Sequence, residues 1–160
     1  MPLEAEIGAL LEAQGLTLAT AESCTGGLVA HHITNTPGSS AYFWGGVVAY
    51  ANEIKEGLLG VDPETLIAYG AVSEQTALEM ARGARRRLGT SLAVSITGIA
   101  GPSGGTPEKP VGLVYIGLAA PDAEICQRHV WDGDRLANKE RSAEAALALV
   151  LGYLQDREDV

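Results

Sequence analysis

Hydrophobic residues recur along this chain at two spacings, one typical of helices and the other of strands. Leu3, Ile7 and Leu11 fall on one helical face, and Gly15 follows them as a suitable helix stop. The stretch 111–119 is nearly continuously apolar, as in a strand at the centre of a sheet covered on both faces. The same patterns predict further strands over 16–20, 47–50, 92–97 and 125–131.

Capping residues mark where most of the other helices begin. Asn52 is a suitable N-cap for a helix over 53–59, and Pro63 stands at the first position of a short helix behind Asp62. Ser73 caps a longer helix that Gly89 closes. We also expect a helix after residue 27 and another from Asp134 to about Gln155, with a frayed tail at 156–160.

Helices and strands thus alternate, with no repeat and no linker between them. This order predicts an α/β single-domain layered fold with a mixed β-sheet flanked by helices. The length of 160 residues fits one domain over 1–160, with its core from about 3 to 155. Apolar residues make up 46% of the chain, which is enough for a substantial core.

The charge and the cysteine content narrow the classes of function. A formal charge of −9 repels phosphate backbones and acidic membranes, so we expect neither nucleic acid nor a membrane as partner. A small anionic ligand remains compatible, since a few local donors can outweigh the global charge. Cys24 and Cys126 predict neither a disulfide framework nor a metal site. Without a signal peptide or a long apolar run, we expect a cytoplasmic protein.

Ser23 and Lys55 are the residues most suggestive of chemistry. Ser23 lies where a predicted strand gives way to a helix, and backbone amides at such a turn can hold an oxyanion. Lys55 is the first cation in the chain and follows the end of the next predicted strand, where α/β proteins place their sites. A buried lysine of lowered pKa can serve as the base that a serine nucleophile needs.

The alternatives to this pair are ordinary structural roles. Spacing alone also fits a helix cap at Ser23 and a surface lysine at 55, and no Gly-x-Ser-x-Gly or Walker A motif occurs. The histidines 31, 32 and 129 fit surface or core positions better than a catalytic base. The arginines at 82 and 85–87 fit a solvated face near a helix C-terminus.

Five short motifs occur in order between residues 16 and 142. They are Thr20-Ala-Glu-Ser-Cys-Thr-Gly-Gly27, Pro37-Gly-Ser-Ser-Ala-Tyr42, Gly45-Gly-Val-Val-Ala-Tyr50-Ala-Asn-Glu53, Gly70-Ala-Val-Ser73 and Gly98-Ile-Ala-Gly-Pro102. Together they closely resemble the CinA C-terminal domain family, the nicotinamide-nucleotide amidases. Many members carry this domain behind a larger nucleotide-processing domain, whose activity is not expected of this chain.

The resemblance implies hydrolysis of nicotinamide mononucleotide to nicotinate mononucleotide and ammonia, in pyridine-nucleotide salvage, with no cofactor and no metal. It implies a serine–lysine mechanism in which Ser23 attacks, Lys55 is the base and Tyr50 aligns the lysine. The remaining residues that we expect to bind the substrate are Cys24, Thr25, Gly26, Gly27, Thr97, Gly98, Gly101, Gly104, Arg135 and Arg141, with the loop 98–105 and one of the two arginines as candidates for the phosphate.

Two rival functions stay open at this point. Cys24 could be the nucleophile, with Glu22 and Lys55 as in nitrilase-like amidases. The chain could also be a binding module, for a nucleotide or for competence proteins, without turnover. In either case a small fold rich in glycine and alanine is expected to form a homo-oligomer.

Overall fold

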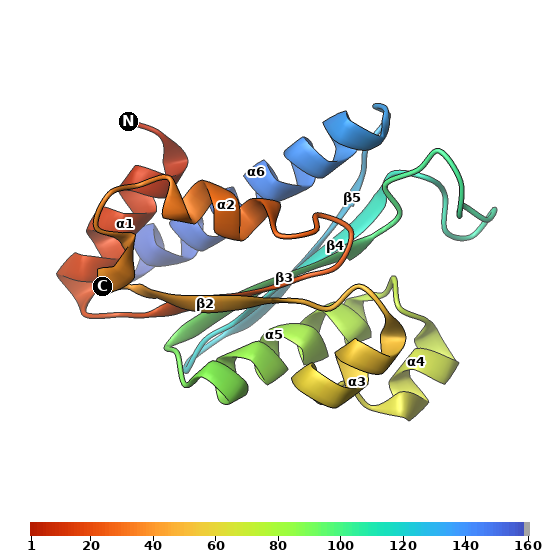
Figure 1. Cartoon of the computed structure of the whole chain (residues 1–160), viewed down its shortest axis with the longest axis horizontal. Coiled ribbons are helices and arrows are strands. Elements are labelled where there is room, and N and C mark those ends of the chain that lie inside the picture. The colour runs from red at the N-terminus through yellow and green to blue at the C-terminus, as the bar shows by residue number, and fades with distance from the viewer. Residues whose placement is uncertain (159–160) are drawn as a thin grey trace.

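The computed structural model describes residues 1–158 and has the predicted α/β layered fold, with a mixed five-stranded sheet between helices (Figure 1). Within the described residues the elements are α1 (Leu3–Gln14), β1 (Leu18–Glu22), α2 (Leu28–Thr34), the 3-10 turn η1 (Ser39–Ala41), β2 (Phe43–Val48), α3 (Asn52–Leu59), α4 (Pro63–Tyr69), α5 (Glu74–Leu88), β3 (Leu92–Gly98), β4 (Leu113–Ala119), β5 (Glu124–Val130) and α6 (Arg135–Glu158).

The strand order is β2-β1-β3-β4-β5. β1 lies between β2 and β3 and is parallel to both, whereas β4 runs antiparallel to β3 and to β5. The carboxyl ends of β1, β2 and β3 therefore meet at one edge of the sheet. Because the chain leaves β1 toward β2 on one side and returns as β3 on the other, this edge is the kind of switch point where α/β sheets bind ligands.

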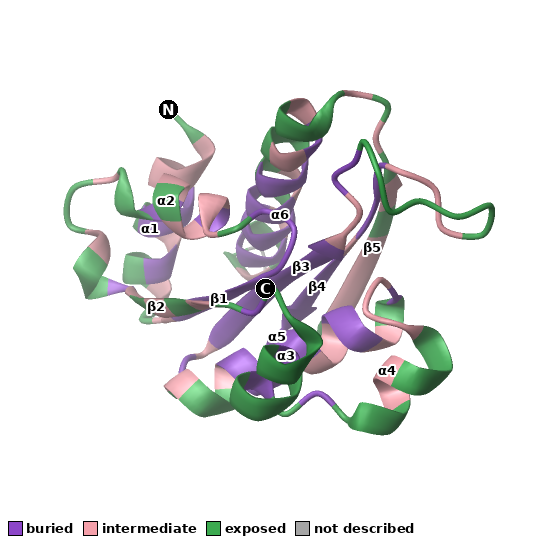
Figure 2. Ribbon diagram, turned by 45° about the vertical axis from the view of Figure 1, so that its right-hand side comes forward, coloured by how far each residue is buried: buried purple, intermediate pink, exposed green. Residues whose placement is uncertain are grey.

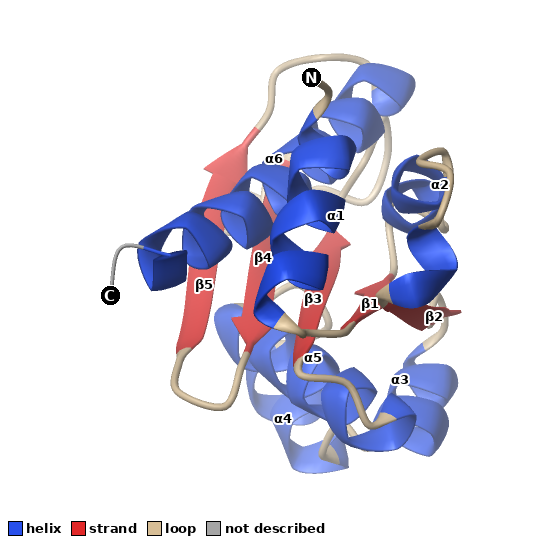
Figure 3. Cartoon of the chain, turned by 90° about the vertical axis from the view of Figure 1, so that its left-hand side faces the viewer, coloured by secondary structure: helices blue, strands red, loops and turns tan. Residues whose placement is uncertain are grey.

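Helices cover both faces of the sheet. α1, α2 and α6 pack on one face, and α3, α4 and α5 lie on the other (Figures 1 and 3). The strands β3 and β4 are buried almost throughout, as Figure 2 shows, which confirms the expectation of a central strand covered on both sides. No helix among residues 1–158 combines the length and apolar character that crossing a membrane would need.

Small side chains let the α5 layer approach its neighbours closely. The core on this face holds Ala19, Ala84 and Ala93, with Leu59 and Met80 as its larger members. Gly83 of α5 lies so near α3 that a β-carbon there would come 1.8 Å from the Leu59 carbonyl oxygen. Gly83 thus allows α5 to lie close against the end of α3, the helix that carries Lys55.

Several predicted boundaries are wrong by a few residues. β2 begins at Phe43 instead of 47, since Gly45 and Gly46 belong to the strand and not to a turn. A β-carbon on Gly46 would lie 2.2 Å from the Thr20 hydroxyl oxygen in β1, so this pairing needs a glycine. β1 is displaced to 18–22, because the carboxylate of Glu22 is buried and hydrogen-bonded instead of facing solvent in a turn.

The helix ends show which caps the local sequence determines. Asp62 accepts a hydrogen bond from the Glu64 amide and Ser73 from the Thr76 amide, as predicted. Asn52 is not an N-cap but the first residue of α3, which has no side-chain cap at Ala51. α6 continues to Glu158, beyond the predicted helix end at about Gln155, while 159–160 lie outside the described residues.

The close approach of α5 to α3 predicts opposite effects of two helical glycine-to-alanine changes. Gly83→Ala forces the helices apart and should lower the free energy of unfolding by about 1–3 kcal/mol. Gly152→Ala in α6, where a new β-carbon meets nothing within 4 Å, should raise it by roughly 0.5–1 kcal/mol. Urea unfolding of both variants beside the unchanged chain tests this; equal effects would contradict the packing described here.

Candidate active site

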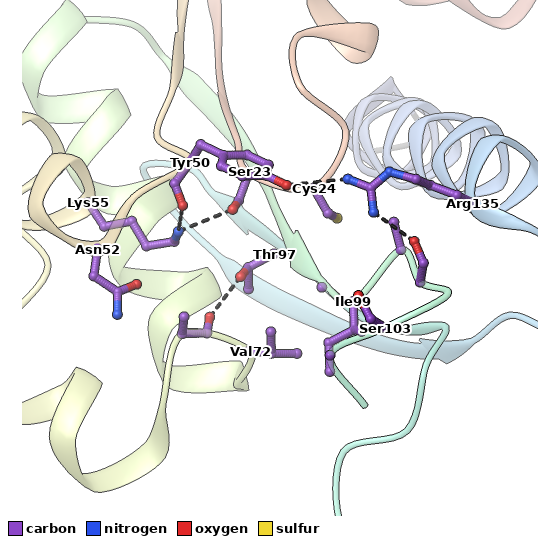
Figure 4. Close-up of a pocket in the computed structure, with 15 residues that line it drawn as sticks. Ser23, Cys24, Tyr50, Asn52, Lys55, Val72, Thr97, Ile99, Ser103 and Arg135 are labelled. Carbon is purple, nitrogen blue, oxygen red and sulfur yellow. Dashed lines mark hydrogen bonds between the residues drawn. The ribbon is translucent and has the colours of Figure 1, made fainter. Parts of the chain in front are cut away.

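The carboxyl ends of the three parallel strands build one open pocket of about 330 Å³ (Figure 4). Ser23 follows β1, Tyr50 follows β2, and Thr97 and Gly98 end β3. This size lies at the lower end of the roughly 300–1,000 Å³ of small-molecule sites. The lining residues are Ser23, Cys24, Tyr50, Asn52, Lys55, Ala71, Val72, Thr97, Gly98, Ile99, Ala100, Gly101, Ser103, Gly104 and Arg135.

Lys55 reaches the pocket from the first turn of α3 and is only 1% exposed. Its Nζ lies 3.1 Å from the Ser23 Oγ, and it donates hydrogen bonds to the carbonyl oxygens of Ala49 (2.9 Å) and Tyr50 (3.0 Å). Within residues 1–158 no carboxylate forms a salt bridge with it. Burial therefore lowers the pKa of Lys55 below its ordinary value.

This arrangement suits a neutral amine. An uncharged lysine has two N–H donors and one lone pair. The carbonyls of Ala49 and Tyr50 take up the two donors. The lone pair is then left for the third neighbour, the Ser23 hydroxyl, which can donate its proton to Nζ. The pair thus has the geometry of a nucleophile and its base.

Glu22 fixes the turn that carries Ser23. Its carboxylate is 1% exposed and accepts hydrogen bonds from the Thr25 hydroxyl (2.6 Å) and from the amides of Val29 (2.9 Å) and Ala30 (3.0 Å) at the start of α2. Sequence reasoning gave Glu22 a role only in the rival cysteine mechanism. Its carboxylate faces α2 and not the pocket, so it braces the turn.

Cys24 lines the pocket but lacks the features of a nucleophile. Desolvation by burial raises the pKa of its thiol to about 11, so it stays protonated near neutral pH. Lys55 contacts Ser23, and the Glu22 carboxylate is occupied by its three donors. The structure therefore favours Ser23 over Cys24.

Arg135 and Tyr50 meet at the rim of the pocket. The guanidinium donates to the Gly101 carbonyl (2.7 Å) and to the Tyr50 hydroxyl (3.3 Å), as Figure 4 shows. Tyr50 is 63% exposed, and its backbone carbonyl, not its hydroxyl, accepts a hydrogen bond from Lys55. We expected the tyrosine to align the lysine, and the contact that does so is made by the main chain.

Arg135 gives the pocket a positive charge in an otherwise acidic chain. Lys55 is the other basic residue that lines the pocket, and no described carboxylate lines it. Asn138 of α6 donates hydrogen bonds to the Ala100 carbonyl in the loop after β3 and to the Gly133 carbonyl just before α6, and so links the two segments next to Arg135. An anionic ligand fits this environment. Among residues 1–158 no group of three or more His, Cys, Asp and Glu side chains is placed to hold a metal ion.

Four of the residues expected to bind substrate lie elsewhere. Thr25, Gly26 and Gly27 line a separate cavity between α2 and α6, and the Gly26 amide already donates to the Ser23 carbonyl. Arg141 pairs with Asp132 (2.9 Å) outside the pocket. The amides of Cys24 and Thr25 donate to no backbone carbonyl within residues 1–158.

Three lining residues outside the loop 98–105 escaped the sequence analysis. Asn52 was taken for a helix cap, and Ala71 and Val72 lie in the segment between α4 and α5, to which no role was assigned. The signal that could have found Asn52 was topological, since it opens the helix that follows β2 at the carboxyl edge of the sheet.

The chain matches the family model of the CinA C-terminal domain over residues 1–154. It is 56% identical to a CinA-like protein of Chloroherpeton thalassium and 53% identical to a putative competence-damage inducible protein of Halothermothrix orenii, each over 94% of this chain. In both comparisons it spans 37% of the length of the curated relative.

Solved structures extend this similarity to the fold. A competence/damage inducible protein from Agrobacterium tumefaciens superposes with a TM-score of 0.92 at 42% identity, covering 96% of this chain and 93% of the other. A CinA superfamily protein from Klebsiella pneumoniae gives the same TM-score at 34% identity, with 96% of each chain covered. By family model, sequence identity and fold together, the chain belongs to the CinA family and corresponds to its C-terminal domain.

Proposed function

We propose that the chain is an amidohydrolase that converts nicotinamide mononucleotide to nicotinate mononucleotide and ammonia. The observation that carries this proposal is the 3.1 Å contact between Ser23 Oγ and the Nζ of a lysine that is buried without a carboxylate partner. Burying an amine without a carboxylate partner lowers the stability of the fold, and a role as the base for Ser23 explains why the lysine is placed there.

The reaction follows from the two side chains. Neutral Lys55 takes the hydroxyl proton as Ser23 Oγ attacks the carboxamide carbon, and the carbonyl oxygen becomes an oxyanion. The amide of Cys24, a residue that lines the pocket, donates to no backbone carbonyl and is the donor that we assign to it. The intermediate collapses to a nicotinoyl ester, and the proton on Lys55 passes to the departing ammonia. Water, activated by Lys55, then hydrolyses the ester and restores Ser23.

The charge of the pocket supports a phosphorylated substrate. Arg135 lies at the rim beside the loop 98–105, at the opposite end of the pocket from Lys55 (Figure 4). A nucleotide with its carboxamide at Ser23 would extend toward this guanidinium, which binds phosphate well because its donors form a planar fork. Arg141, paired with Asp132 outside the pocket, is the weaker candidate.

The names of the relatives describe those proteins as competence- or damage-inducible, which keeps a binding module without turnover as the rival. The two functions separate in one assay, since only an amidase releases ammonia from nicotinamide mononucleotide. Binding of this nucleotide without ammonia release at any pH between 6 and 10 would sink the amidase proposal.

Replacing the nucleophile and its neighbour distinguishes serine from cysteine chemistry. Ser23→Ala should lower ammonia release to background, because no group remains to form the ester. Cys24→Ala should keep activity within about tenfold, since its thiol is protonated and takes no part. An active Ser23→Ala enzyme beside an inactive Cys24→Ala enzyme would overturn the assignment of Ser23.

The buried lysine predicts the direction of the pH dependence. Only its neutral form can accept a proton, so kcat/KM should rise with pH through an ionisation below the ordinary lysine pKa of 10.5. Lys55→Met should lower kcat by about 10²–10⁴-fold and remove this ionisation from the profile. If the ionisation persists in the Lys55→Met enzyme, another group is the base.

The rim arginine predicts a selective change in substrate affinity. Arg135→Gln should raise KM for nicotinamide mononucleotide at least about tenfold, because a charged hydrogen bond to the phosphate is lost. For nicotinamide riboside, which lacks the phosphate, KM should change little. Arg141→Gln serves as the matched control, and a larger effect there would move the phosphate contact to that residue.

A further inference from the structure

A second pocket, of about 430 Å³, lies beside the first on the α5 side of the sheet. α5 covers the sheet at Gly117, where a β-carbon would lie 2.8 Å from the Ala77 carbonyl oxygen. The helix begins only at Glu74, however, so it does not cover the next cross-strand pair, Tyr115 of β4 and Arg128 of β5. The pocket lies over this uncovered pair.

The charges in this second pocket favour an anion. The Arg128 guanidinium forms no hydrogen bond and no salt bridge with any residue in 1–158, and Lys109 donates to the Tyr69 carbonyl. Glu74 is the one carboxylate among its described lining residues, and it lies beyond salt-bridge distance of both cations. The pocket therefore holds an excess positive charge and a guanidinium whose donors are free.

Two aromatic side chains flank these cations. Tyr115 lies directly opposite Arg128 in the strand ladder, and Tyr69 closes the pocket from the end of α4. Tyrosine faces accept the flat face of a base, and a guanidinium binds phosphate with two donors. We propose that this second pocket binds a small aromatic anion of the mononucleotide class.

A wall of backbone separates this pocket from the candidate active site. Val72 lines both pockets, so the segment 70–72 forms the partition. The Thr97 hydroxyl donates to the Ala71 carbonyl (2.7 Å), and the Ser73 and Thr76 hydroxyls donate to the Gly70 carbonyl (3.0 and 2.7 Å). The second pocket is thus distinct from the Ser23 site, and the inference does not rest on the amidase proposal.

Titration calorimetry of the full chain with adenosine 5′-monophosphate tests the site. We expect saturable binding that Arg128→Gln weakens at least about tenfold and Glu74→Gln strengthens, since these changes remove the free cation and the opposing carboxylate. Ser23→Ala and Arg135→Gln should leave it unchanged. Arg87→Gln on exposed α5 surface is the matched control for loss of a positive charge.

Opposite shifts from Arg128→Gln and Glu74→Gln would support the proposal, because a purely structural role moves both variants the same way. Inorganic phosphate as a second probe should bind more weakly, since it cannot use the tyrosines. The proposal is overturned if the mononucleotide does not bind at millimolar concentration, or if Ser23→Ala or Arg135→Gln abolishes its binding. Thermal unfolding of each variant verifies that the fold is intact.

Discussion

The arrangement of the site depends on one constraint, which is that the Lys55 amine is held away from water among three oxygen atoms and no carboxylate. Two of these oxygens come from the chain just after β2 and the third from the residue just after β1. The amine can be satisfied only if these two parallel strands end side by side. The contacts that hold the Lys55 amine therefore depend on the parallel pairing of β1 with β2.

The alternation of side chains along β1 keeps the buried carboxylate of Glu22 apart from the buried amine of Lys55. Glu22 and Ser23 are neighbours in sequence, and neighbouring residues of an extended chain point to opposite faces. The Glu22 carboxylate turns to α2, where backbone amides and a hydroxyl satisfy it, whereas Ser23 turns to Lys55. A carboxylate in contact with the amine would hold its proton and prevent it from acting as a base.

The order of helices and strands was predictable because it rests on local signals, such as the caps at Asp62 and Ser73. The start of β2 was not, since the glycines 45 and 46 have poor strand propensity and join the sheet only through tertiary pairing with β1. β1 was likewise predicted to end at residue 20 and not at Glu22. The burial of Glu22 depends on α2, which folds back over it.

The convergence of strand ends in α/β folds made Ser23 and Lys55 candidates, and the resemblance to the CinA family chose this pair over a helix cap and a surface lysine. The partners that orient Lys55 could not be predicted, because they are backbone carbonyls, which every residue type has. Tyr50 was therefore assigned through its phenol, although its main chain makes the contact. Likewise, only coordinates could separate Arg135, at the pocket rim, from Arg141, which pairs with Asp132.

The three-residue connection 49–51 between β2 and α3 has a consequence for variation in this fold. Surface loops usually tolerate insertions better than the elements that they join. Here two consecutive peptide groups of the loop hold the amine, and the helix that carries it starts immediately afterwards. One added residue would change the reach of Lys55 and the direction of both carbonyls together, so this short connector should be as intolerant of length changes as a core strand.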